Sequence, residues 1–163
     1  MNAVQTDSGY TALMWASEKG HLEIARLLLD KGADVNAGKT DDGFTALMFA
    51  SDDGNLEIAR LLIDKGANVN AAVTGRYSGF TALMAACEKG YLEMARLLLE
   101  KGCSVNAATT SSRWTALMFA ADLGHLYIVQ LLLSKGADRK AKSRGGNTAA
   151  FLATDPAVMA ALE

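Results

Sequence analysis

Long apolar segments are absent from this chain of 163 residues. A membrane-spanning helix needs about 20 apolar residues in succession, and no run approaches that length. The first residues, Met-Asn-Ala-Val-Gln-Thr-Asp, also lack the basic segment and apolar stretch of a signal peptide. We therefore expect no membrane partner and an intracellular location.

Cysteine and histidine are scarce, with two of each. Cys87 and Cys103 stand where other copies of the repeat described below have Ser or Ala, so we interpret them as small fillers in a reducing compartment. The scattered thiols and imidazoles do not match the spacing of zinc ligands. The chain also lacks a nucleophile–base arrangement. We predict no metal, no cofactor and no enzymatic activity.

No charge of one sign dominates, because 16 basic and 18 acidic residues leave a net charge of −2. This balance argues against nucleic acid as a partner. The charges are unevenly spread: residues 1–75 have 6 bases and 11 acids, whereas residues 76–163 have 10 bases and 7 acids. An elongated molecule would therefore have an acidic half and a basic half.

The chain contains a repeat. Thr-Ala-Leu-Met stands at 11–14, 45–48, 81–84 and 115–118, and a Thr at 148 begins a shortened copy. Successive copies lie 34, 36, 34 and 33 residues apart, whereas the step of 21 residues from Thr11 to Gly32 recurs unchanged in the next three copies. This pattern is typical of a rigid unit joined by loops of variable length.

Each unit predicts two short helices. Thr11 is suited to cap a helix over 12–19, and Gly20 to end it in a left-handed conformation. The Leu-rich stretch 22–31 predicts a second helix, with Glu23 and Arg26 paired on its solvent side. Such a helix pair buries its apolar faces only by stacking on its neighbours, which makes a solenoid.

The stretch TALMWASEKGHLEIARLLLDKGADVNA at 11–37 closely resembles the ankyrin repeat. That family has Thr-Pro-Leu-His, then Gly-His, a Leu-rich helix and Gly-Ala-Asp-Val-Asn-Ala. The resemblance covers essentially the whole chain. It implies an all-α repeat solenoid of helix-turn-helix pairs joined by β-hairpin-like fingers.

Two positions depart from the family pattern, since Ala12 and Met14 replace Pro and His. Losing the His should remove a polar contact. We expect the methionines of this position to form an apolar ladder between repeats, and the alternative is a sticky binding surface. They are Met14, Met48, Met84 and Met118.

The repeats are expected at about 7–39, 41–75, 77–109 and 111–143, followed by a C-terminal capping repeat at 144–163. Residues 1–6 read as the remnant of a preceding repeat, which is typical of a piece of a longer array or of an engineered chain. Repeat 1 is as apolar as the internal repeats. We therefore expect it to expose a helical face that frays or drives weak end-to-end self-association.

The resemblance also implies where a partner binds, because ankyrin fingers and first helices form a concave groove. Aromatic residues stand just before each capping Thr or four residues after it: Tyr10, Trp15, Phe44, Phe49, Phe80, Trp114 and Phe119. Charged residues or a further aromatic occupy the first-helix ends and the finger tips: Glu18, Asp41, Asp42, Asp52, Asp53, Arg76, Tyr77, Lys89 and Arg113. Two interpretations of the aromatic rows stay open, namely contact residues or half-buried supports of the fingers.

Two features of this groove are specific to the chain. The four aspartates of repeat 2 predict a negative surface that favours a basic segment of the partner. The third finger is longer, since 11 residues separate Asn70 from Thr81 where 9 separate Asn36 from Thr45. We predict that this finger projects over the groove with Arg76 and Tyr77 against the partner.

The sequence thus favours a non-catalytic protein–protein interaction module that binds another protein or a peptide. One alternative is a methyl-lysine reader. Ankyrin domains of certain histone lysine methyltransferases hold methyl-lysine in a cage of aromatic residues plus an acid, and Tyr10, Trp15, Glu18 and Phe49 resemble that set. The other alternative is a structural spacer whose groove contacts nothing.

Overall fold

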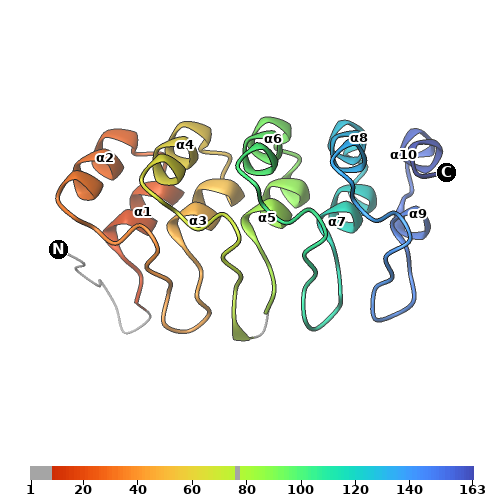
Figure 1. Cartoon of the computed structure of the whole chain (residues 1–163), viewed down its shortest axis with the longest axis horizontal. Helices are drawn as coiled ribbons and strands as arrows, with labels where there is room; N and C mark the ends of the chain where they lie inside the picture. The colour runs from red at the N-terminus through yellow and green to blue at the C-terminus, as the bar shows by residue number, and fades with distance from the viewer. Residues whose placement is uncertain (1–8, 76–77) are drawn as a thin grey trace.

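A computed structural model describes residues 9–75 and 78–163 of the chain. Within these residues ten helices form five stacked pairs (Figure 1). The first helices of the pairs are α1 (Ala12–Glu18), α3 (Ala46–Asp52), α5 (Ala82–Lys89), α7 (Ala116–Asp122) and α9 (Ala149–Leu152). The second helices are α2 (Leu22–Asp30), α4 (Leu56–Asp64), α6 (Leu92–Glu100), α8 (Leu126–Ser134) and α10 (Pro156–Leu162). The predicted all-α repeat solenoid is confirmed.

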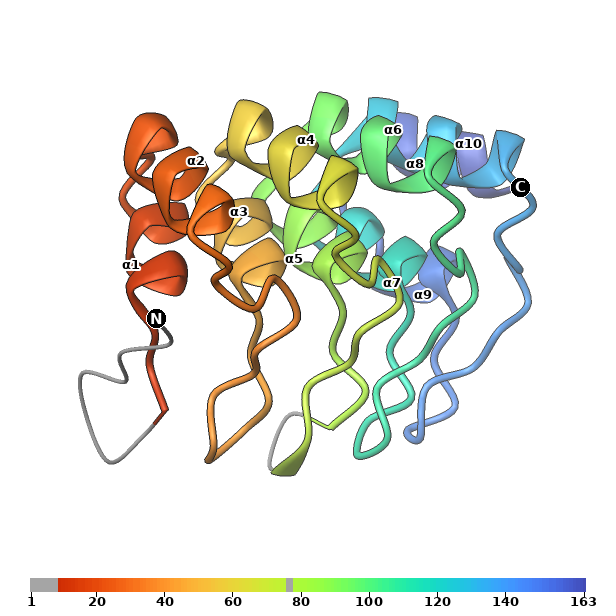
Figure 2. The ribbon, with the colours of Figure 1, turned by 60° about the vertical axis from the view of Figure 1, so that its left-hand side comes forward.

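The first helices contact one another in order along the array, and the second helices form a parallel outer row. Long loops, the fingers, all extend from the row of first helices (Figure 2). We call the first helices and fingers together the inner face. No helix in the described part of the chain has the length and apolar character needed to cross a bilayer.

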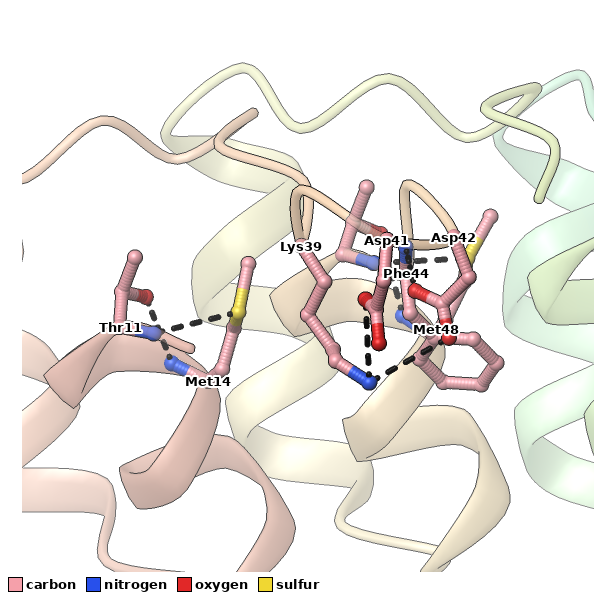
Figure 3. Close-up of polar contacts among 8 residues, drawn as sticks. Thr11, Met14, Lys39, Asp41, Asp42, Phe44 and Met48 are labelled. Carbon is pink, nitrogen blue, oxygen red and sulfur yellow. Dashed lines mark hydrogen bonds and ion pairs between the residues drawn. The ribbon is translucent and has the colours of Figure 1, made fainter. Parts of the chain in front are cut away.

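A threonine begins each first helix. Thr11 Oγ1 accepts a hydrogen bond from the Met14 amide at 3.2 Å, and the other four copies repeat this cap. In return the Thr11 amide donates to Met14 Sδ at 3.4 Å, and the Thr45 amide donates to Met48 Sδ at 3.5 Å (Figure 3). The expected loss of a polar contact is therefore wrong for repeats 1 and 2, because the thioether sulfur serves as a weak acceptor.

The methionines are core residues. Met14, Met48, Met84 and Met118 are each at most 1% exposed. Their predicted burial in the core is confirmed, and the alternative of a sticky Met surface is wrong.

The fingers are held in register by backbone contacts. Isolated antiparallel bridges close three of them, and neighbouring fingers are joined by backbone hydrogen bonds. For example, the Thr74 amide donates to the Asp42 carbonyl at 2.7 Å, and the Thr110 amide donates to the Ser78 carbonyl at 2.7 Å. The row of fingers is therefore one continuous wall of the inner face.

Asparagine side chains that follow the second helices link each repeat to the next one. Asn70 Oδ1 accepts from the Ser104 amide at 2.7 Å, and Asn70 Nδ2 donates to the Gly102 carbonyl at 3.4 Å. Asn36 and Asn106 make the same pair of contacts to the following repeat. These bonds fix the spacing between neighbouring repeats independently of the apolar core.

Both ends of the array expose apolar side chains. Ile24 and Leu27 of α2 are 45% and 59% exposed, as the sequence predicted for repeat 1. At the other end Phe151 is 72% exposed, although it occupies the position of the buried methionines. In each case no further repeat covers the side chain within the described residues.

Candidate binding site

The aromatic residues of the inner face form two groups. Tyr10 and Phe44 both contact Phe49, with ring centroids 5.2 Å and 4.7 Å apart. Phe80 and Trp114 likewise contact Phe119, at 5.7 Å and 5.0 Å. All six rings are partly buried and pack against the core. They therefore support the finger bases and still leave ring surface for a partner, so the two interpretations of the aromatic rows are compatible.

A hollow of about 720 Å³ separates the two groups. We call it the central hollow. It is lined by Asp42, Phe44, Asp52, Val73, Phe80, Glu88, Thr109, Ser111, Ser112, Trp114 and Phe119. Repeat 3 contributes Phe80 and Glu88 to this lining, and its Ala85 stands where repeats 2 and 4 have Phe49 and Phe119.

The charged side chains that line the hollow are all acidic: Asp42, Asp52 and Glu88. Two lysines lie near them. Lys89 Nζ is 3.6 Å from Asp52, and Lys39 Nζ is 3.3 Å from Asp42 and 3.4 Å from Asp41 (Figure 3). Four carboxylates and two ammonium groups therefore surround the hollow, which leaves it negative.

Glu18 and Tyr10 form a separate polar cluster in repeat 1. The Tyr10 hydroxyl donates to the Glu18 carboxylate, and Lys19 Nζ lies 2.5 Å from the same group. The bonds from Lys19 and then Tyr10 lower the pKa of Glu18, while burial and the bond to Glu18 raise the pKa of Tyr10. Burial, followed by the charges of Asp52 and Glu18, raises the pKa of nearby Asp53. The Glu18 carboxylate is thus already satisfied within the chain.

Only three of the four residues of the suggested methyl-lysine cage come together, because Tyr10 contacts Glu18 and Phe49 while Trp15 stands apart. The Trp15 ring packs on His21, with centroids 4.9 Å apart, while Tyr10 packs on Phe49. Trp15 has no ring contact with Tyr10 or Phe49 among the described residues. The methyl-lysine alternative therefore lacks support at this position.

Arg113 lies apart from the central hollow. It lines a second hollow of about 240 Å³ together with Asn106 and Asp138, while its neighbour Trp114 lines the first. Its φ of 57° is in the left-handed region, where Gly43 and Gly79 stand in the equivalent positions of repeats 2 and 3. We find no geometric link between Arg113 and the aromatic groups.

The extra residues of the third finger are confined to its tip. The Val73 amide donates to the Phe80 carbonyl at 2.8 Å, and the equivalent bond in repeat 2 joins Lys39 to Phe44. Arg76 and Tyr77, which the sequence placed against a partner, lie outside the described residues. The described base of the finger contributes Val73 to the floor of the central hollow.

Sequence reasoning missed several lining residues. Val73, Thr109, Ser111 and Ser112 belong to fingers of which only the charged and aromatic tips were chosen. Glu88 stands at the position of Asp52 at the end of a first helix, where the resemblance to the ankyrin repeat already implied partner contacts. The four finger residues have no compositional feature that marks them.

The two cysteines and His125 have structural roles. Cys87 is buried, and burial raises its pKa, while burial raises the pKa of Cys103 to about 11. His125 Nε2 contacts the Glu88 carbonyl at 3.1 Å across the repeat boundary. Among residues 9–75 and 78–163, no group of three or more His, Cys, Asp or Glu side chains could hold a metal ion.

Stacked helix pairs, threonine-capped first helices and a row of fingers define a repeat solenoid. The model of ankyrin repeats (three copies) matches residues 1–73 and 72–143. The chain therefore belongs to the ankyrin repeat family, whose members generally mediate protein–protein interactions and are typically non-catalytic. No curated protein matches the chain.

Proposed function

We propose that this chain is a non-catalytic module that binds a protein or peptide partner along its inner face. The central hollow is the observation that carries this proposal. Its four aromatic rings are the type of side chain that dominates interface energies, and they belong to the fingers and first helices that make up the inner face. A spacer with no groove ligand needs no such hollow.

The partner segment near repeat 2 is basic. Four carboxylates around the hollow exceed the two lysines that face them, and Asp53 adds a further acid at the end of α3. Exposed charges of this kind steer a charged partner and are screened over about 8 Å at physiological salt. Association should therefore slow as ionic strength rises.

The long third finger contributes a second contact. Arg76 and Tyr77 are residue types enriched at binding hot spots, and their finger is joined to the wall that lines the hollow. Replacing both with Ala should weaken partner binding by at least about 2 kcal/mol and leave the unfolding midpoint nearly unchanged. Unaltered affinity would mean that the extra length is tolerated drift.

A selection from random short peptides, followed by variant binding, tests the proposed function. Phe44→Ala and Trp114→Ala change the inner face, whereas Glu57→Gln with Arg60→Gln removes an exposed pair on α4, where the two groups lie 3.7 Å apart. We expect the inner-face variants to weaken binding by at least about tenfold and the α4 variant to leave it unchanged. A reversed pattern would refute the proposal, and failure to select any peptide would support the spacer.

A further inference from the structure

We propose that the central hollow binds an arginine side chain of the partner. The guanidinium would stack on the aromatic rings and pair with Glu88 and Asp52. This inference rests on the proposed function, since it names the side chain that the partner inserts into the inner face.

Repeat 3 lacks one of the aromatic rings of the inner face. In repeats 2 and 4 the rings of Phe49 and Phe119 contact the aromatic residue before the capping threonine. Ala85 supplies no such ring beside Phe80 and is itself fully buried. The volume of the hollow, about 720 Å³, lies within the roughly 300–1,000 Å³ typical of ligand sites. The central hollow therefore has room for one long side chain of a partner and for part of the partner residues next to it.

The walls of the hollow suit a planar cation. Phe44 lies on the repeat 2 side, and Phe80, Trp114 and Phe119 form the contacting group on the other. Aromatic faces attract cations, Trp most strongly, and a guanidinium can stack flat on a ring while its apolar stem contacts the others. A neutral apolar residue would also fit these walls, so charge decides the occupant.

Glu88 is the carboxylate best placed to receive a cation. It lies in the last turn of α5, where the negative end of the helix dipole adds to its charge. Its side chain has no ion-pair partner among the described residues. A guanidinium at Glu88 would therefore displace no ion pair within residues 9–75 and 78–163.

Asp52 and Asp42 are partly engaged. Asp52 shares its charge with Lys89 at 3.6 Å, and both side chains are more than a third exposed. Asp42 accepts from the Phe44 amide at 2.9 Å and from Lys39 at 3.3 Å. Asp52 can thus exchange its exposed lysine for a partner cation, whereas Asp42 acts through its charge alone.

Arginine fits this arrangement better than lysine. Glu88 and Asp52 belong to different repeats, and the five donors of a guanidinium can reach two carboxylates while the plane stays stacked. The ammonium of lysine is a compact, strongly hydrated charge without a planar face. The hydroxyls of Thr109 and Ser112 also line the hollow, but they bond to each other at 2.7 Å, and Thr109 Oγ1 accepts from the Trp114 amide at 2.9 Å.

The test uses the selected peptides that bind the inner face. One peptide position should be enriched in arginine, and replacing that arginine with citrulline, its neutral analogue, should raise Kd by at least about tenfold. Lysine should restore only part of the affinity. For the Glu88→Gln variant, the arginine and citrulline peptides should have nearly the same Kd. Asp122→Asn is the matched control.

Asp122 occupies the position of Glu88 in repeat 4 but does not line the hollow. A second variant, Ala85→Phe, restores the ring found in repeats 2 and 4 and should abolish the arginine preference. Its thermal unfolding checks that it still folds, and Glu88→Gln keeps the proposal testable if it does not.

Different failures have different meanings. Inner-face peptides that bind equally well with citrulline, or that lose as much affinity with Asp122→Asn as with Glu88→Gln, would overturn the arginine site and leave the proposed function intact. A preference for lysine over arginine would overturn it as well. Peptides whose affinity is unchanged by the inner-face variants would refute the proposed function itself.

Discussion

Lys89 Nζ lies 3.6 Å from Asp52 Oδ1, across the boundary between repeats 3 and 2. Their side chains are 45% and 38% exposed. Exposed ion pairs of this kind contribute only about 0–1 kcal/mol to stability. The pair therefore matters mainly because it sets how much negative charge the central hollow presents to a partner.

Removing this lysine should speed partner association. We expect Lys89→Ala to raise the association rate constant for an arginine-containing peptide, because it exposes the Asp52 charge, and to change the free energy of unfolding by less than about 1 kcal/mol. Stopped-flow binding at several salt concentrations measures this, and the advantage should shrink as salt increases. Lys65→Ala is the control, since Lys65 pairs with Asp30 at 2.8 Å between the outer helices. A slower association for Lys89→Ala would contradict a negative hollow.

Truncating a central methionine should be costly. Met84 is 0% exposed, so Met84→Ala leaves a cavity and should lower the free energy of unfolding by roughly 2–5 kcal/mol. Denaturant titration measures the loss. Met159→Ala should cost far less because Met159 is 42% exposed. Equal losses for the two variants would be inconsistent with a buried ladder.

Arg113 is the place where a substitution should stabilise the chain. Its φ of 57° costs about 1–2 kcal/mol for a residue other than Gly. A Gly there costs about 0.4–1 kcal/mol because it gives the unfolded chain more conformational freedom, so Arg113→Gly should raise the free energy of unfolding by about 0–1.6 kcal/mol. Peptide affinity should stay unchanged, since Arg113 does not line the central hollow. A large loss of affinity would mean that the strained residue contacts the partner.

The opposite change at the equivalent glycine should be harmful. Gly79 has a φ of 87°, and an added Cβ would lie 2.8 Å from the Ala108 carbonyl oxygen. Gly79→Ala should therefore lower the unfolding midpoint, which thermal denaturation measures. A stabilised Gly79→Ala would remove the physical basis for the Arg113 prediction.

Repeat 1 should be the least protected part of the array. Ile24 and Leu27 are 45% and 59% exposed, whereas α6 of repeat 3 is covered on both sides. We expect α1 and α2 to exchange amide hydrogens faster than α5 and α6 in a dilute sample, and Leu27→Glu to weaken any end-to-end association at high concentration. Equal protection of repeats 1 and 3 in the monomer would show that repeat 1 needs no cover.

The helices could be predicted from the sequence because their signals are local. The Thr11 hydroxyl caps the start of a short helix, and Gly20 adopts the left-handed conformation that ends it. The predicted span 12–19 differs from α1 by one residue. The burial of Met84 follows from the same spacing, since the methionines of the first four copies are all buried.

The binding site could be predicted only in part, because it depends on contacts between repeats. Phe80 and Phe119 are 39 positions apart in the sequence, yet their ring centroids lie 5.7 Å apart. Ala85, which stands where repeats 2 and 4 have a ring, is a small residue that composition does not single out. The sequence also did not predict that the ammonium group of Lys39 forms ion pairs with Asp41 and Asp42.

The two tryptophans offer the most direct test of partner binding at the inner face. Trp114 lines the central hollow, whereas Trp15 packs on His21 in repeat 1. In an isotope-labelled sample titrated with a selected arginine-containing peptide, we expect the indole N–H resonance of Trp114 to shift and that of Trp15 to stay in place. A peptide that binds without moving the Trp114 resonance would contradict binding in the hollow.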